Sequence, residues 1–238
     1  MTVVMAQRTP TMRRFALRDL TTESWRNGGG VTRVVARGAG TTGAGAIGAG
    51  ANGPGTGNQA TDADGWTWRV SVADITRDGP FSRFPGAQRQ LRLMHGAGFE
   101  LRGEHRVWRA AQLGDVLVFS GDEPVHAHLL GGPVRVWNLM LRGQSWRGQL
   151  RTWTHSAHEW VQPFAMCAAD ELAAAIVFAL EGDVAVCAAT LADGLTDMAL
   201  AEGEGVCLVA PPAGLRLQLA AAGATALVTE IYAAAPAA

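Results

Sequence analysis

The chain has 238 residues, of which 48% are hydrophobic and 17% charged, and its formal net charge is −1. This length allows one large core or two smaller ones. The nearly neutral charge gives no reason to expect nucleic acid or an anionic membrane as a partner. Because the sequence shows neither a leader-like N-terminus nor an apolar run of about 20 residues, we expect no secretion and no membrane span.

The three cysteines are Cys167, Cys187 and Cys207, and all lie in apolar contexts without C-x-x-C spacing. An odd number of such cysteines favours reduced thiols in the core rather than a disulfide framework. We therefore expect a cytoplasmic protein.

The first strand is expected near residues 14–17 and the second over residues 31–36. Residues 38–65 are almost entirely Gly, Ala, Thr and Asn, with no aromatic residue before Trp66. Such a segment buries too little apolar surface to offset its ordering entropy, so we interpret it as a flexible insertion between strands.

Short apolar or alternating segments follow at regular intervals, separated by glycine-containing turns. Many short strands with this punctuation predict a β-sandwich or barrel. The expected strands are residues 66–72, 89–94, 99–102, 107–110, 116–119, 125–130 and 134–140.

The last third of the chain faintly repeats the first part. Residues 170–178 can be a strand or a helical turn, and residues 226–230 parallel residues 134–138. A repeat of this kind favours two stacked barrels over one larger barrel. We therefore predict an N-terminal barrel over residues 12–142, including the insertion 38–65, and a C-terminal barrel over residues 143–238.

The stretch Trp25–Arg33 places three glycines behind an aromatic side chain and an amide. Glycine lets the backbone adopt φ > 0 and expose N–H groups to an anion. Asn27 adds a donor and an acceptor, and Trp25 presents an indole N–H. A glycine-rich hairpin with a core tryptophan explains the same pattern.

Two of the expected strands carry polar side chains in alternating positions. Thr67, Arg69 and Ser71 share one face of their strand, and Asn138 is an amide in an apolar row. Inside a barrel, Arg69 and Ser71 could join Asn138 around a small carboxylate, which a guanidinium holds bidentately. A structural polar network, or a solvent-exposed face, remains the alternative.

Five motifs occur in order, and together they resemble the HutD/Ves family: WRNGGGVT from residue 25, WRVSVAD from 68, GPFSRFPG from 79, FSGDEPV from 119 and GPVRVWNLM from 132. The resemblance covers residues 14–142 well. It implies an all-β bicupin, with two cupin-like barrels in one chain. It also implies a link to histidine utilisation, where binding of formylglutamate or urocanate has been proposed, or to stress responses, without an established enzymatic activity.

Two positions depart from the family pattern. Val34 and Val136 stand where the family usually has Glu and Asp. If the two positions are close in the pocket, losing both carboxylates avoids leaving one buried charge without its partner. We hypothesise a less acidic pocket in which Arg33, Arg69 or another cation is available to an anionic ligand.

Metal-dependent catalysis is the natural competitor, because many cupins bind a metal through histidines. His126 and His128 share one strand face, but residues 84–92, where the first cupin motif would supply ligands, contain arginines that repel a cation. Residues 155–159 (HSAHE) have ligand-like types, and we expect them in a surface loop. No nucleophile elbow is present.

We therefore expect a metal-free, cofactor-free bicupin that binds a small anionic metabolite and acts as a sensor or modulator. An isomerase or lyase of small acids using the same pocket, or a protein-interaction module, remains the alternative. Pairing of barrel edges makes a homodimer possible. We assign no catalytic residue, and the predicted ligand-binding residues are Trp25, Asn27, Gly28, Gly29, Gly30, Arg33, Arg69, Ser71, Phe84, Asn138 and Met140.

Overall fold

The computed structural model describes residues 11–39, 65–154, 171–188, 198–211, 215–219 and 222–234. These residues form strands and turns, with one short 3-10 helix, η1 (Leu17–Asp19). Among them, no helix has the length and apolar character to cross a membrane. The predicted all-β class is confirmed.

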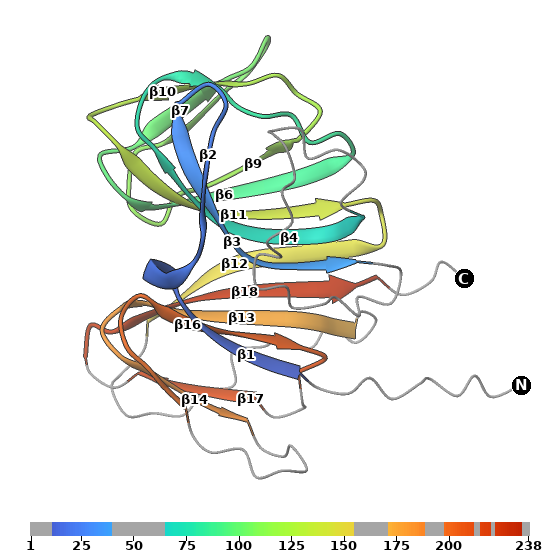
Figure 1. Cartoon of the computed structure of the whole chain (residues 1–238), viewed down its shortest axis with the longest axis vertical. Coiled ribbons are helices and arrows are strands. Elements are labelled where there is room, and N and C mark those ends of the chain that lie inside the picture. Colours follow the sequence, from blue (N-terminus) through green and yellow to red (C-terminus); the bar gives the residue numbers. More distant parts are fainter. Residues whose placement is uncertain are drawn as a thin grey trace, which may run out of the picture.

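The first half contributes two antiparallel sheets that face each other (Figure 1). The larger has the order β2-β3-β4-β11-β6-β9, and the smaller has the order β5-β10-β7-β8. Their strands are β2 (Thr22–Ser24), β3 (Gly30–Ala39), β4 (Trp66–Ile75), β5 (Gly79–Pro80), β6 (Ala87–His95), β7 (Phe99–Arg102), β8 (Val107–Ala110), β9 (Val116–Ser120), β10 (His126–Leu129) and β11 (Val134–Arg142).

The second half repeats this arrangement with a five-stranded sheet, β1-β16-β13-β18-β12, and a three-stranded sheet, β15-β14-β17. Their strands are β1 (Thr11–Ala16), β12 (Trp146–Thr154), β13 (Glu171–Glu181), β14 (Val184–Ala188), β15 (Met198–Leu200), β16 (Glu204–Val209), β17 (Leu215–Leu219) and β18 (Thr225–Ala233).

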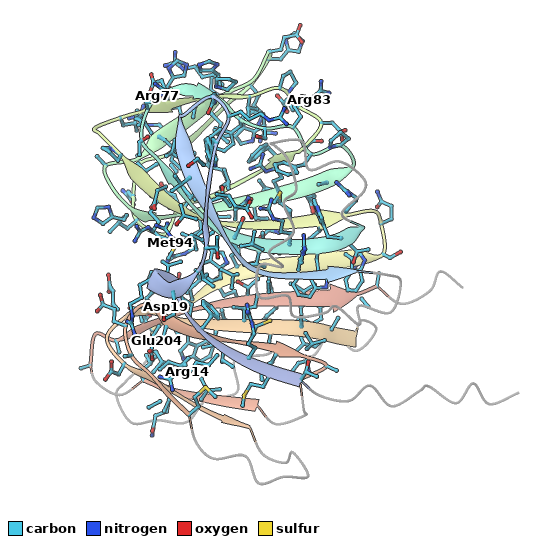
Figure 2. All side chains as sticks on the ribbon, in the orientation of Figure 1. Arg14, Asp19, Arg77, Arg83, Met94 and Glu204 are labelled. Carbon is cyan, nitrogen blue, oxygen red and sulfur yellow. The ribbon has the colours of Figure 1, made fainter. Side chains whose placement is uncertain are left out.

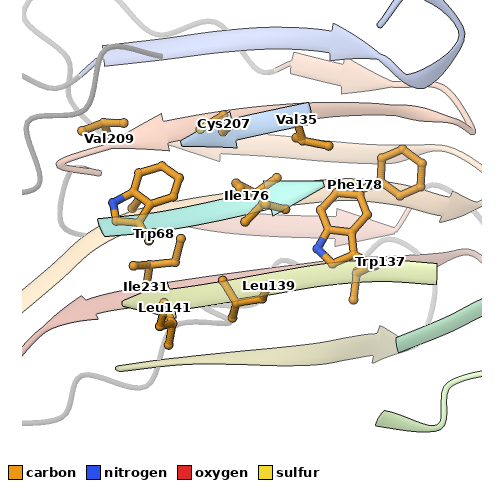
Figure 3. Close-up of a cluster of buried hydrophobic side chains, with 14 of the residues drawn as sticks. Val35, Trp68, Trp137, Leu139, Leu141, Ile176, Phe178, Cys207, Val209 and Ile231 are labelled. Carbon is orange, nitrogen blue, oxygen red and sulfur yellow. The ribbon is translucent and has the colours of Figure 1, made fainter. Parts of the chain in front are cut away.

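Alternation of side chains gives each large sheet two buried faces. The inner face of β4, β6 and β11 meets the smaller sheet of its half in one apolar core, and β13, β16 and β18 do the same in the second half. A third core lies between the two large sheets, where Trp68 and Trp137 pack against Ile176 and Phe178 (Figure 3). We call the two enclosed halves the first and second barrel.

Most of the predicted strands lie within a few residues of their expected positions. Strand β3 extends to Ala39, so residues 38 and 39 belong to a strand and not to the expected insertion. Residues 40–64 of that insertion, and residues 155–159, lie outside the described residues. Strand β12 was not predicted, and residues 171–181 form a strand instead of a helical turn.

The N-terminal strand connects the two halves. Strand β1 pairs along its whole length with β16, so residues 11–16 belong to a sheet of the second half. Arg14 forms an ion pair with Glu204 across this pairing, and Arg13 donates to the carbonyl oxygen of Val35 in β3 at 2.8 Å. The domain boundary at residue 142 stays a prediction, and β1 lies across it.

Candidate functional site

Neighbouring strands of the first barrel bring polar side chains into two adjacent rows on the inner face of the large sheet. In the first row, Arg69 of β4 pairs with Met140 of β11, and Met140 pairs with Arg89 of β6. In the second row, Ser71 pairs with Asn138. Directly opposed side chains in a sheet are about 5 Å apart at Cβ, so these residues form one cluster, which we call the arginine cluster.

Arg89 is the centre of this cluster, and only 4% of its surface is exposed. Three phenylalanine rings surround its guanidinium, with Cζ at 5.4 Å from the centroid of Phe81, 5.0 Å from Phe84 and 4.9 Å from Phe119. Such contacts attract a cation through the ring quadrupole, but they do not satisfy its N–H donors.

The hydrogen bonds of Arg89 are incomplete. Nη1 donates to the carbonyl oxygen of Ser82 at 3.1 Å, whereas Nε is buried without an acceptor. Within the described residues, no carboxylate forms an ion pair with this guanidinium. Burial, and to a lesser degree repulsion from Arg69, lowers the pKa of Arg89 well below its usual range, to about 9.

The adjacent row, formed by Ser71 and Asn138, also contains buried polar atoms without hydrogen-bond partners in the described part of the chain. Ser71 is fully buried and Asn138 is 6% exposed. The Ser71 hydroxyl and the Asn138 Oδ1 have no hydrogen-bond partner among the described residues. Buried polar atoms of this kind are nearly always satisfied in proteins, by protein groups, water or a ligand. Arg69, which is half-buried, lies with its guanidinium 5.9 Å from the ring of Phe84.

The second barrel holds a polar cluster at the corresponding place, but there it is satisfied. Glu230, fully buried on the central strand β18, accepts hydrogen bonds from Arg151 at 2.7 Å and Tyr232 at 2.8 Å, and from Gln149. The carboxylate and its donors neutralise one another, so this cluster needs no external group. The two barrels therefore differ in what their interiors leave unsatisfied.

The hydrogen bonds of the glycine turn are made largely within the turn itself. Asn27 accepts from Gly29 N at 2.9 Å and donates to the Pro80 carbonyl at 2.9 Å, and Gly28 N donates to the Trp25 carbonyl. Gly28 and Gly29 thus use the N–H groups that the sequence suggested for an anion. Any ligand contact of this turn stays a prediction.

Trp25 connects the turn to the cluster through Phe81. Its indole Nε1 donates to the Thr32 hydroxyl at 2.8 Å, and its ring packs edge-on against Phe81, with centroids 5.4 Å apart. Phe81 in turn contacts Arg89. Trp25 is therefore one aromatic ring away from the buried guanidinium.

Arg33 does not join the cluster, and the expectation that it shares a pocket with Arg69, Ser71 and Asn138 is wrong. Its Nη1 lies 2.6 Å from Oδ2 of Asp74, which alternates with Ala73 and points away from the barrel core. Arg135 binds the same carboxylate at 2.6 Å. The side chain of Arg33 therefore lies on the outer face of the sheet.

Val34 and Val136 are not directly opposed. Val34 pairs with Ser71, whereas Val136 pairs with Ala73, so strand β4 lies between them and their rows differ. Strands in a sheet are about 4.8 Å apart, which puts the two valines on the order of 10 Å apart. The argument that each carboxylate compensates for the other as a direct neighbour is therefore not supported.

The residues considered for a metal lie apart from the arginine cluster. On β10 the rings of His126 and His128 are 5.3 Å apart, and His128 Nδ1 lies 3.2 Å from Oδ2 of Asp78. Among the described residues, no group of three or more His, Cys, Asp or Glu side chains is arranged to hold a metal ion. The free thiol of Cys207 is buried in the core between the sheets, and burial raises its pKa to about 12.

Sequence reasoning placed Arg69, Ser71, Asn138 and Met140 on the right face but missed Arg89 as a site residue. Its signal was present, because Arg89 alternates with Leu91 and Leu93 on β6 and so falls on their buried face. A charged residue on the apolar face of a strand is the pattern that identifies it.

The fold defines the class of protein: two stacked antiparallel barrels in one chain form a bicupin. A HutD family model matches residues 17–228, and the chain therefore belongs to the HutD family. The predicted family is confirmed.

Three relatives illustrate this membership. An uncharacterized 21.2 kDa protein of the hutC 3' region of Pseudomonas putida is 33% identical over 53% of this chain and 56% of its own length. Protein Ves of Escherichia fergusonii is 28% identical over 59% of this chain and 63% of its own. The matched stretches thus span less than two thirds of either relative. The crystal structure of a conserved protein of unknown function from Pseudomonas aeruginosa PAO1 has a TM-score of 0.69 and 26% identity, covering 93% of this chain and 98% of that one.

Proposed function

We propose that this bicupin binds a small anionic metabolite at the arginine cluster of the first barrel and thereby modulates histidine utilisation or a stress response. The observation that carries the proposal is Arg89, a buried guanidinium with an unused Nε donor and without an ion-paired carboxylate among the described residues. A bound carboxylate would supply both the acceptor and the countercharge.

The neighbouring atoms extend the same complementarity. Asn138 Oδ1 offers an acceptor and Ser71 Oγ can donate or accept, so a ligand with a carboxylate and an N–H or O–H donor satisfies all three groups. Formylglutamate and urocanate, which the family resemblance suggests, both have these groups. The half-buried Arg69 adds a second positive charge on the same row.

The second barrel supports the choice of the first. Glu230 already carries three hydrogen bonds from the protein, and its negative charge disfavours an anion there. The proposed regulatory role rests on the name of the Pseudomonas putida relative, which places that protein in the hutC 3' region. The proposal also includes a cytoplasmic location and no nucleic-acid or membrane partner.

Isothermal titration with formylglutamate, urocanate and formate, none of which has a free α-amino group, tests the binding. Arg89→Met should abolish binding of every acid that binds the wild-type protein. Arg92→Met is the matched control, because Arg92 is also a buried arginine of β6 but faces the other side, where it donates to the Thr152 hydroxyl. Equal affinity of wild type and Arg89→Met, or no binding of any acid, would overturn the proposal. Consumption of the acid during the titration would show that the protein is an enzyme and not only a binding protein.

A further inference from the structure

A cavity lies between the two barrels, on the opposite side of β3, β4 and β11 from the arginine cluster. It has a volume of about 520 Å³ and is lined by residues of η1, of the large sheet of the first barrel, and of the turn before β16. Figure 2 shows this junction, where Asp19, Arg14 and Glu204 are labelled. The lining residues are Leu17, Arg18, Arg33, Arg135, Glu202 and Gly203.

The wall formed by the first barrel carries an excess positive charge. Arg33 and Arg135 share the single carboxylate of Asp74, with N–O distances of 2.6 Å each. Arg33 uses Nη1 for this contact, and Arg135 uses Nε and Nη2. A guanidinium has five N–H donors, so both arginines keep donors for another acceptor.

The opposite wall carries a negative charge. Glu202 accepts a hydrogen bond from Gly182 N at 3.2 Å, and within the described residues it has no ion-pair partner. Arg18, the third arginine of the cavity, lies 3.5 Å from Glu204, which also binds Arg14, and 4.0 Å from Asp19. These two arginines and two carboxylates balance one another in charge. The two walls thus present opposite charges across one space.

We propose that this cavity binds a zwitterionic α-amino acid, with its carboxylate on Arg33 and Arg135 and its ammonium group on Glu202. A carboxylate without an amino group can bind only Arg33 and Arg135 and is repelled by Glu202. An amine without a carboxylate can bind only Glu202. The volume falls in the usual range for small-molecule sites, about 300–1,000 Å³. This site is independent of the arginine cluster, which faces the barrel interior.

The test is a thermal-shift screen of the twenty protein amino acids, followed by titration calorimetry of those that stabilise the full chain. The best amino acid is then compared with its deaminated and decarboxylated analogues, and we expect both to bind at least about tenfold more weakly, the scale of losing one hydrogen bond to a charged group. Glu202→Gln should lower the affinity for the amino acid to a similar degree, because the amide oxygen can still accept from Gly182 N but the side chain has no charge.

Glu104→Gln is the matched control, since Glu104 is 78% exposed on the turn after β7 and far from this cavity in sequence and sheet. Arg89→Met should leave amino-acid binding unchanged, which separates this site from the arginine cluster. Equal binding of the deaminated analogue would show an anion site and overturn the proposal. So would unchanged affinity in Glu202→Gln, loss of amino-acid binding in Arg89→Met, or the absence of binding by any amino acid.

Discussion

Asn138 on β11 and Glu230 on β18 occupy corresponding places in the two barrels. Asn138 pairs with Ser71 on one side and Leu91 on the other, and Glu230 pairs with Gln149 and Ala175. The protein satisfies the buried Glu230 carboxylate with three donors, whereas Asn138 Oδ1 has no partner among the described residues. Equivalent positions in a repeated fold have thus diverged, one into a satisfied polar network and one into a buried amide whose oxygen has no partner among the described residues.

Arg89→Met should stabilise the ligand-free protein while abolishing acid binding. The substitution removes a buried charge without a countercharge, and replacing such groups by apolar ones of similar size is often stabilising, here by about 1–3 kcal/mol. Urea unfolding of both proteins without ligand measures the difference. A large loss of stability would mean that the phenylalanine rings and the Ser82 carbonyl already compensate the charge.

The same arginine gives a pH dependence with a defined sign. Burial lowers its pKa in the folded protein to about 9, well below its usual value, so above pH 9 the unfolded chain binds more protons than the native one. Stability from this group therefore rises with pH from about 9 upwards. The difference in unfolding free energy between Arg89→Met and wild type should shrink between pH 8 and pH 10, and a constant difference would contradict the lowered pKa.

How much of this site follows from the sequence depends on the strand. On β4 and β11 the alternation of polar and apolar residues is regular, so Ser71 and Asn138 could be placed on the inner face. On β3 the apolar residues Val34 and Val35 are consecutive and the pairing with β4 shifts between Val34 and Ala36. Alternation there has no clear phase, and the face of Arg33 could not be predicted.

Strand β12 could not be predicted from the sequence for a different reason. It lies at the edge of its sheet, and only Trp146 among its residues is buried. Its polar composition therefore resembles a loop, and its place follows from pairing with β18. Sequence pattern predicts strands with at least one continuous buried face, whereas edge strands depend on a partner far along the chain.

Asp74→Asn should destabilise the protein at neutral pH and have little effect in strong acid. Burial alone would raise the pKa of Asp74, but hydrogen bonds and charge from Arg135 and Arg33 outweigh it and lower the pKa below its usual range. The stabilisation is therefore present above the unfolded pKa of about 4 and is lost as pH falls through the lower folded value. Unfolding free energies of both proteins from pH 2 to pH 7 should converge at the acid end, and a gap that persists at pH 2 would assign the effect to shape rather than charge.

Glu230→Ala should destabilise the second barrel without changing acid binding in the first. The substitution removes the carboxylate that accepts from Tyr232, Gln149 and Arg151 and opens a cavity, which together should cost about 2–4 kcal/mol. Chemical denaturation and titration with the best-binding acid measure the two effects separately. A parallel loss of affinity in the folded variant would show that the two barrels are coupled.

Gly30→Ala tests whether the glycine run is required by packing. A Cβ at residue 30 would lie 2.3 Å from the carbonyl oxygen of Asp74, a backbone atom of the neighbouring strand. The strands β3 and β4 must then separate, and we expect a loss of about 1–3 kcal/mol, as for other overpacked sites. Gly79→Ala is the control, because its Cβ would meet only the Asn27 side chain at 3.4 Å. If thermal unfolding shows both variants equally stable, the close approach of β3 and β4 at residue 30 does not explain the glycine, and a ligand contact of the turn becomes the better account.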